Sequence, residues 1–199
     1  MKSNVCKIEQ GTRDLAAILK ESERVAEYNG FTHKQTLQLR LLCEEIDGML
    51  PNLIDDFEGD LWIEYEEGTC RVNVRVKIPE FDARKKEELI GIAKNKKNAA
   101  AVGIVGKIRN AIENLFLRDG EEEGYIDPAD LFYCSAEYYE GVNYSYLWTL
   151  NRYKSTVQEA EKVEDWDELE KSIIANLADD VIVGVKGKEA TITVVKKFK

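Results

Sequence analysis

Residues 60–79, "DLWIEYEEGTCRVNVRVKIP", constrain the fold more than any other stretch of the chain. Every second residue in the later half is apolar: Val72, Val74, Val76 and Ile78. Because successive side chains of a strand point to opposite faces of a sheet, this spacing predicts a strand with one buried face. With a turn at Glu67–Thr69, the stretch predicts an antiparallel hairpin with strands over 61–66 and 70–78. Another layer must then cover its apolar face.

Two helices are predicted before the hairpin, and they supply that layer. The first spans 13–28, with Thr12 as its N-cap, and ends at the Asn-Gly pair 29–30. The second begins at a capping box formed by Thr32 and Gln35. Both helices therefore have recognisable start signals in the sequence.

The second helix carries the residues that bear most on function. Its apolar face recurs at helical spacing: Leu42, Ile46, Met49 and Leu53. Glu45 shares the edge of this face with Leu41 and Met49, because residues four apart lie on the same side of a helix. Pro51 should kink the helix or end a section of it.

The remainder of the chain continues the alternation of helices and strands. Strands are predicted over 4–9 and 142–153, helices over 83–95, 100–117 and 165–177, a polar connection over 156–164, and a final hairpin turning near Gly187. Helices in pairs and strands in hairpins are typical of the α+β class. The expected fold is a two-layer α/β sandwich, in which a mixed, mostly antiparallel sheet is covered by helices on one face.

Composition narrows the partners and the compartment. The net charge is -10 and the pI about 4.8, so the surface repels phosphate backbones and anionic lipid; neither a nucleic acid nor a membrane is an expected partner. No apolar run approaches the ~20 residues of a membrane-spanning helix, and the N-terminus lacks the apolar core of a secretory signal. These features predict a cytoplasmic protein. Its four cysteines match no metal-binding spacing, and its single histidine, His33, leaves little room for histidine chemistry.

The order of elements, together with "LRLLCEEIDGM", resembles the GHKL or Bergerat ATPase domain of histidine kinases and of bacterial anti-sigma-factor serine kinases. The anti-sigma kinases are the most similar in size. Their second helix bears Glu-x-x-x-Asn, and Glu45 takes the glutamate position. The resemblance covers about residues 4–155. It implies an ATPase-like domain over 1–155, with 156–199 as a helix-plus-hairpin extension packed on the same domain.

In that family the glutamate activates the attacking hydroxyl, and the asparagine holds Mg²⁺ against the phosphates of ATP. The resemblance therefore makes Glu45 a vestigial catalytic base. The asparagine position is Met49, whose thioether is a poor ligand for a hard cation. Neither a metal site nor Mg²⁺ binding is therefore expected. Shifting the alignment by one residue places Glu44 and Gly48 in the two positions, which supplies no ligand either.

Two further family motifs bear on ATP binding. The family's adenine-reading aspartate follows the hairpin within a glycine-rich turn; here "VKIPEFDAR" has no glycine, and Asp82 is a displaced candidate. The family's phosphate-binding glycine loop precedes a helix, and Gly103, Gly106 and Lys107 stand in the corresponding region. These glycines can equally be small residues that allow close helix packing. Weak ATP binding is the most that these motifs predict.

Three functions remain open from the sequence. The first is a regulatory protein-binding module, similar to an anti-sigma factor, whose acidic surface favours a basic protein partner. The second is an active ATP-dependent serine kinase or ATPase. The third is a ligand-sensing domain. Residues 156–199 could extend the sheet, cover its open face or form a homodimer contact.

Overall fold

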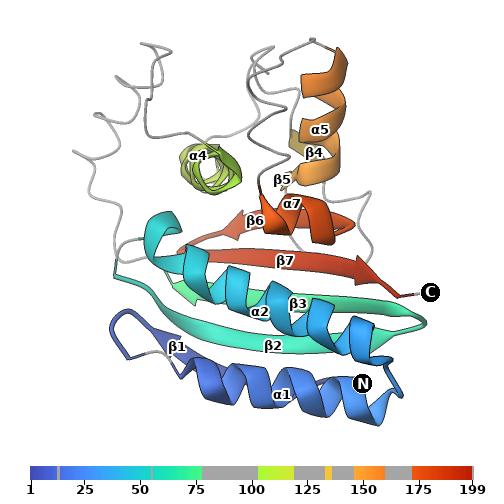
Figure 1. Ribbon diagram of the computed structural model, residues 1–199. Helices are drawn as coiled ribbons and strands as arrows, with labels where there is room; N and C mark the ends of the chain where they lie inside the picture. Colours follow the sequence, from blue (N-terminus) through green and yellow to red (C-terminus); the bar gives the residue numbers. More distant parts are fainter. Residues whose placement is uncertain are drawn as a thin grey trace.

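In the computed structural model, one antiparallel sheet carries a layer of helices (Figure 1). The structure describes residues 1–12, 14–54, 56–77, 103–118, 133–135, 146–159 and 172–198. The strands are β1 (Cys6–Glu9), β2 (Glu58–Glu66), β3 (Thr69–Lys77), β4 (Tyr133–Ser135), β5 (Tyr146–Thr149), β6 (Asp180–Lys186) and β7 (Glu189–Lys197). Their order in the seven-stranded sheet is β1-β2-β3-β7-β6-β5-β4.

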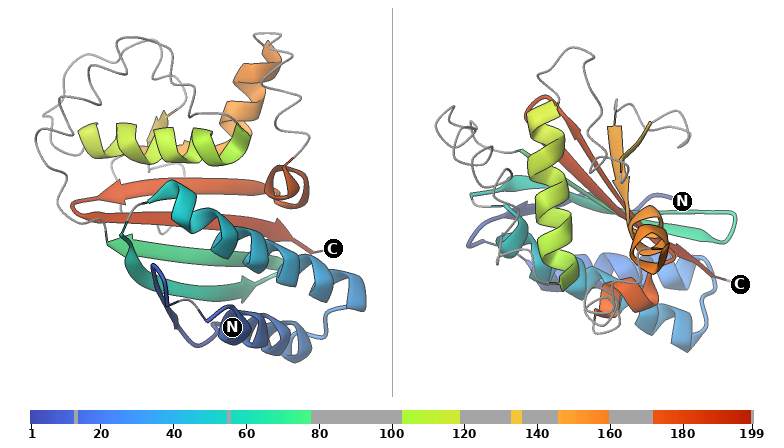
Figure 2. Two further views of the ribbon diagram at one scale, coloured as in Figure 1. Left: turned by 60° about the vertical axis from the view of Figure 1, so that its left-hand side comes forward. Right: turned by 90° about the horizontal axis from the view of Figure 1, so that it is seen from above.

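The helices pack on one face of this sheet, and Figure 2 shows the arrangement from two further sides. They are α1 (Leu15–Tyr28), α2 (His33–Leu53), α4 (Gly103–Arg118), α5 (Leu150–Glu159) and α7 (Ile173–Leu177). The apolar sides of these helices and of the central strands form one buried core. The predicted α+β class, with helices layered on a sheet, is confirmed at this level.

The β2–β3 hairpin confirms the pattern of alternating side chains. Its strands are longer than predicted, and Leu61 pairs with Val74 and Ile63 with Val72, all on the buried face. The turn uses positive φ angles at Glu67 (46°) and Gly68 (80°). Two consecutive residues with positive φ match the twist of a two-residue hairpin loop.

The first two helices begin and end near the predicted residues. Thr32 and Gln35 form the predicted capping box of α2, and Asn29 is the C-cap of α1. Pro51 lies in the last turn of α2, which ends at Leu53. The predicted N-cap of α1 is wrong: Asp14, not Thr12, accepts the hydrogen bond from the backbone of the first turn.

Two other predictions are corrected. The sequence pattern predicts a strand that continues through 150–153, but α5 begins at Leu150 and also takes in part of the expected connection 156–164. Thr149 accepts a hydrogen bond from the backbone N–H of Arg152 and so starts the helix. The sheet is not mixed among the described strands, because every neighbouring pair is antiparallel.

The C-terminal hairpin lies in the middle of the sheet. β7 pairs with β3, and β6 pairs with β5, so residues 156–199 share one sheet with the first part of the chain. The hairpin turns at Gly187, as predicted. Its apolar residues face the helices and are fully buried: Val181, Val183, Ile192 and Val194. Among the alternatives left open for this segment, the structure shows a contribution to the sheet.

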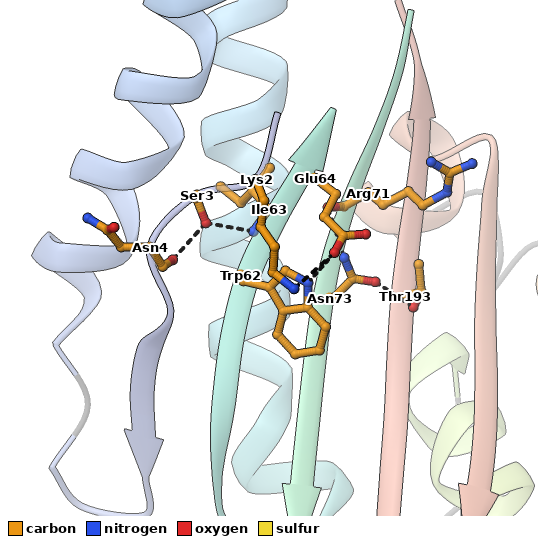
Figure 3. A network of polar contacts seen from close by, with 9 residues as sticks. All are labelled: Lys2, Ser3, Asn4, Trp62, Ile63, Glu64, Arg71, Asn73 and Thr193. Carbon is orange, nitrogen blue, oxygen red and sulfur yellow. Dashed lines mark hydrogen bonds and ion pairs between the residues drawn. The ribbon is translucent and has the colours of Figure 1, made fainter. Parts of the chain in front are cut away.

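The sheet face that points away from these helices carries a ladder of opposite charges. Acidic residues of β2 lie directly opposite basic residues of β3: Glu58 and Lys77, Asp60 and Arg75, Glu64 and Arg71. Trp62 sits among them, with Lys2 4.8 Å and Arg75 5.3 Å from its ring centre, and donates a 2.8 Å hydrogen bond to Glu64 (Figure 3). Cross-strand pairs of this kind stabilise a sheet while keeping its surface polar.

Two glycines give a matched test of this packing. A Cβ added at Gly59 would run into the carbonyl oxygen of Arg75 and lie 2.9 Å from Val76 Cα, whereas one added at Gly48 would meet nothing within 4 Å. We expect Gly59→Ala to lower the free energy of unfolding by about 2–4 kcal/mol, because backbone atoms must shift. Gly48→Ala, in an exposed helix position, should raise it by up to about 1 kcal/mol. Urea unfolding of both variants checks the pair, and equal effects would contradict the hairpin register.

Candidate functional site

The two sides of α2 have different neighbours. On one side, Arg40 bridges to Glu23 of α1 at 2.8 Å. On the other, the backbone oxygen of Asn52 accepts a 3.5 Å hydrogen bond from Arg109 of α4, and α7 also packs against α2. Figure 1 shows α4 and α7 on the side of α2 that is opposite α1. Helical geometry places Leu41, Glu45, Met49 and Asn52 on this second side, which we call the Glu45 face.

The adjacent carboxylates Glu44 and Glu45 have separate roles. Glu44 accepts a 3.1 Å hydrogen bond from Nε of Arg40, within an ion pair on the α1 side. Glu45 is partly exposed, and no hydrogen bond or ion pair links it to another residue of the described ranges. An ion pair on a helix surface accounts for Glu44 in structural terms. Glu45 has no such explanation, so it remains the candidate functional carboxylate of this helix.

Met49 belongs to the core. It is 6% exposed and lies in the buried cluster with Leu50 and Leu53. Its thioether therefore fills apolar space one turn after Glu45. A soft, buried sulfur offers a hard cation such as Mg²⁺ no useful bond.

The predicted phosphate-loop residues open α4. Gly103 is the first residue of this helix and has a φ of 73°. Gly106 is buried in the first turns. The Lys107 ammonium lies 5.5 Å from the centre of the Tyr153 ring of α5, in cation–π geometry. These three residues therefore stand at the end of α4 that approaches α5.

A second set of polar contacts joins α5 to α7 and β6. Nζ of Lys154 donates a 2.6 Å hydrogen bond to the backbone oxygen of Ala175 in α7. Asp180, at the start of β6, accepts a 3.0 Å hydrogen bond from the backbone N–H of Asn151 in α5. Burial lowers the pKa of Lys154 and raises the pKa of Asp180, because both charges are partly withdrawn from water. The set fixes α5 against the strands and α7 against α5.

The sequence prediction missed Tyr153, because it placed 142–153 in a strand, and it assigned Lys154 no role. A signal was present: Leu150, Tyr153 and Val157 recur at helical spacing, and all three are buried. No comparable signal shows that Lys154 would reach α7. That contact joins segments far apart in the chain and depends on the tertiary arrangement.

Asp82, the predicted adenine-reading residue, lies outside the described residues, as does the predicted helix 83–95. The structure therefore brings Glu45 and Met49 to the side of α2 that faces α4, and Gly103, Gly106 and Lys107 to the first turns of α4. It does not report on Asp82. Within the described ranges, no group of three or more His, Cys, Asp or Glu side chains could hold a metal ion.

The structure describes the thiols of three cysteines: Cys6, Cys43 and Cys70. Cys43 and Cys70 are buried, and burial raises the pKa of both thiols, that of Cys70 to about 12. Such thiols stay protonated at neutral pH and are poor nucleophiles. Cys6 is partly buried, and its pKa is also raised by burial.

Comparison with protein-family models, with curated proteins and with solved structures finds no match to this chain. No helix in the described ranges is both long and apolar enough to cross a membrane.

Proposed function

We propose that this chain is a regulatory protein-binding module, similar in role to an anti-sigma factor, on a scaffold resembling the GHKL or Bergerat ATPase domain, and that it turns over ATP weakly or not at all. One observation carries the proposal. Glu45 lies on the side of α2 that faces α4 and α7 without a partner among the described residues, while Met49, one turn later, is buried in the core. The helix therefore has a carboxylate at the position of the catalytic base, but it has no metal-binding side chain at position 49.

The order of elements supports the scaffold. A strand, two consecutive helices and an antiparallel hairpin come first, and α4 begins with the glycines that resemble a phosphate loop. The net charge of -10 supports a basic protein partner, since complementary charge speeds and orients association. Neither argument requires nucleotide.

An active serine kinase or ATPase of the same family is the second candidate. The observation that favours it is Glu45 itself, partly exposed on the side that faces the helix of Gly103 and Lys107. In that case Mg²⁺ would have to be held without a ligand at position 49. A transferred phosphoryl group carries charge that a bridging metal normally neutralises, so turnover without one should be slow.

A partner complex separates these two functions. The full chain, tagged and recovered from its native cells, should retain a basic protein in nucleotide-free buffer containing a chelator. The purified pair should re-form with defined stoichiometry, and its affinity should fall as salt is raised from about 50 to about 500 mM, because screening weakens charge attraction. A complex that forms only in the presence of MgATP, or phosphate transferred to a serine of the partner, would favour the kinase.

A further inference from the structure

We propose that the sheet face away from the helices docks an acidic segment of another protein, through Arg71 and Arg75 of β3 and the uncharged side chains beside them on β7 and β6. This surface, which we call the Arg71–Arg75 face, lies on the other side of the sheet from α2 and its Glu45 face. The proposal goes beyond the function proposed above and does not depend on it.

The carboxylates of β2 form their ion pairs on the side of the sheet away from β3. Asp60 lies across from Arg75 in the hairpin, but its ion pair is with Lys7 of β1, at 2.6 Å. Glu64 pairs in the same way with Lys2 of the N-terminal segment, at 3.2 Å. The acidic side chains nearest to β3 are therefore already engaged by other cations.

The two arginines of β3 have no ion pair in the part of the chain that the structure describes. Arg75 is exposed and lies 5.3 Å from the centre of the Trp62 ring, a contact that leaves its positive charge uncompensated. Arg71 is partly exposed, and its side chain extends from β3 toward β7, away from Glu64 (Figure 3). In a chain with 38 acidic and 28 basic residues, two cations without a carboxylate partner mark this face as a place for an external carboxylate.

Uncharged side chains adjoin the arginines on the side of β7. Val195 lies across from Arg71, Thr193 follows on the same face of β7, and Ile182 of β6 lies across from Thr193. All three are partly exposed. Apolar and hydroxyl-bearing side chains bordered by guanidinium groups fit a segment in which carboxylates flank an apolar residue.

The strand also fixes the spacing of the two charges. Arg71 and Arg75 are four residues apart on one face of β3, so their Cα atoms are about 13 Å apart at about 3.3 Å per residue. Two carboxylates four residues apart in an extended segment match this distance, and each can accept two parallel hydrogen bonds from a guanidinium group.

A nucleic acid fits this face less well than a protein segment. The net charge of -10 repels a long phosphate backbone from the rest of the surface. Trp62, the aromatic side chain beside Arg75, is only 9% exposed, so it offers little ring surface on which a base could stack. An acidic protein segment is therefore the occupant that the charges and the exposure favour.

Peptide selection against the full chain tests this surface. Short random peptides displayed on phage are selected on the immobilised chain, and the enriched sequences are synthesised with a fluorophore for anisotropy titrations. The test variant combines Arg71→Gln with Arg75→Gln. The matched control combines Lys20→Gln with Lys34→Gln, which removes the same charge from exposed positions of α1 and α2. A third variant, Arg71→Lys with Arg75→Lys, keeps the charge and loses the two-bond geometry.

We expect the enriched peptides to be rich in Asp and Glu around an apolar residue, and their affinity to fall as salt is raised from about 50 to about 500 mM. The double glutamine variant should weaken binding at least about tenfold, the double lysine variant less, and the control less than about twofold. Urea unfolding of each variant verifies that the fold is kept. Enriched peptides without an excess of acidic residues, or equal binding by the double glutamine variant and the unmodified chain, would overturn the proposal.

Other occupants give different outcomes. A single-stranded oligonucleotide, or vesicles of anionic phospholipid, that bind more tightly than the selected peptides and are lost in the double glutamine variant would replace the proposal with a phosphate-bearing ligand. A dimer in sedimentation velocity that dissociates in that variant would replace it with a second copy of the chain. The basic partner of the proposed function should bind this variant and the unmodified chain equally, so the failure of one proposal leaves the other standing.

Discussion

A chain that lacks residues 160–199 is expected to lose its cooperative unfolding transition. The deletion removes α7, β6 and β7, which leaves β3 paired with β2 alone and separates β5 from β1, β2 and β3. Loss of a single large buried side chain costs about 2–5 kcal/mol, and a whole domain is stable by only about 5–15 kcal/mol. The hairpin alone buries several such side chains, so the remaining chain should be insoluble or molten. A truncated protein with an unchanged melting temperature would contradict this arrangement.

A pair of point variants separates loss of packing from loss of chain length. Ile192 is 0% exposed on the core face of β7, so Ile192→Asp buries an uncompensated charge. Thr191, on the opposite face, is partly exposed and lies across from Arg75 of β3 and Gly184 of β6. We expect Ile192→Asp to lower the free energy of unfolding by about 4 kcal/mol or more. Thr191→Asp should change it by less than about 1 kcal/mol, because the new charge stays on the partly exposed face and lies across from Arg75.

Local patterns in the sequence predicted those parts of the fold that depend on neighbouring residues. Alternation from Val72 to Val76 indicated the hairpin, and the pair Thr32 and Gln35 indicated the start of α2. The position of the C-terminal hairpin could not be predicted in this way. Pairing between β3 and β7 joins segments more than about 100 residues apart, such as Asn73 and Thr193, and no local signal selects it among several buried arrangements.

Only part of the candidate site was predicted, because the sequence shows local spacing and not the contacts between distant segments. Helical spacing placed Glu45 and Met49 on one side of α2, since residues four apart share a side. Which element covers that side is a tertiary property, so the contact between Lys154 and Ala175 had no signal of its own. The error at residues 150–153 arose from the aromatic and β-branched residues before Leu150. These favour a strand, whereas Thr149 and Asp180 cap a helix there.

Magnesium-dependent ATP turnover is expected to be absent or very slow, and the reason is Met49. Phosphoryl transfer relies on a metal that bridges the phosphate oxygens and neutralises the developing charge. The residue one turn after Glu45 is a thioether buried at 6% exposure, so Mg²⁺ would be held by nucleotide and water alone. If the proposed scaffold is right, the lack of glycine in the sequence after β3 should weaken adenine binding separately. Met49→Asn alone should therefore not restore activity, and a buried asparagine should also destabilise the core.

Calorimetric titration of ATP into the unmodified chain, with and without Mg²⁺, tests the central claim most directly. If the scaffold serves binding rather than turnover, any heat should correspond to an affinity in the millimolar range, and Mg²⁺ should change it less than about threefold, a difference of under about 1 kcal/mol. Glu45→Ala and Gly103→Val should leave this weak signal unaltered. Tight binding that requires Mg²⁺ and is abolished by either substitution would contradict the account and establish the ATP-dependent enzyme instead.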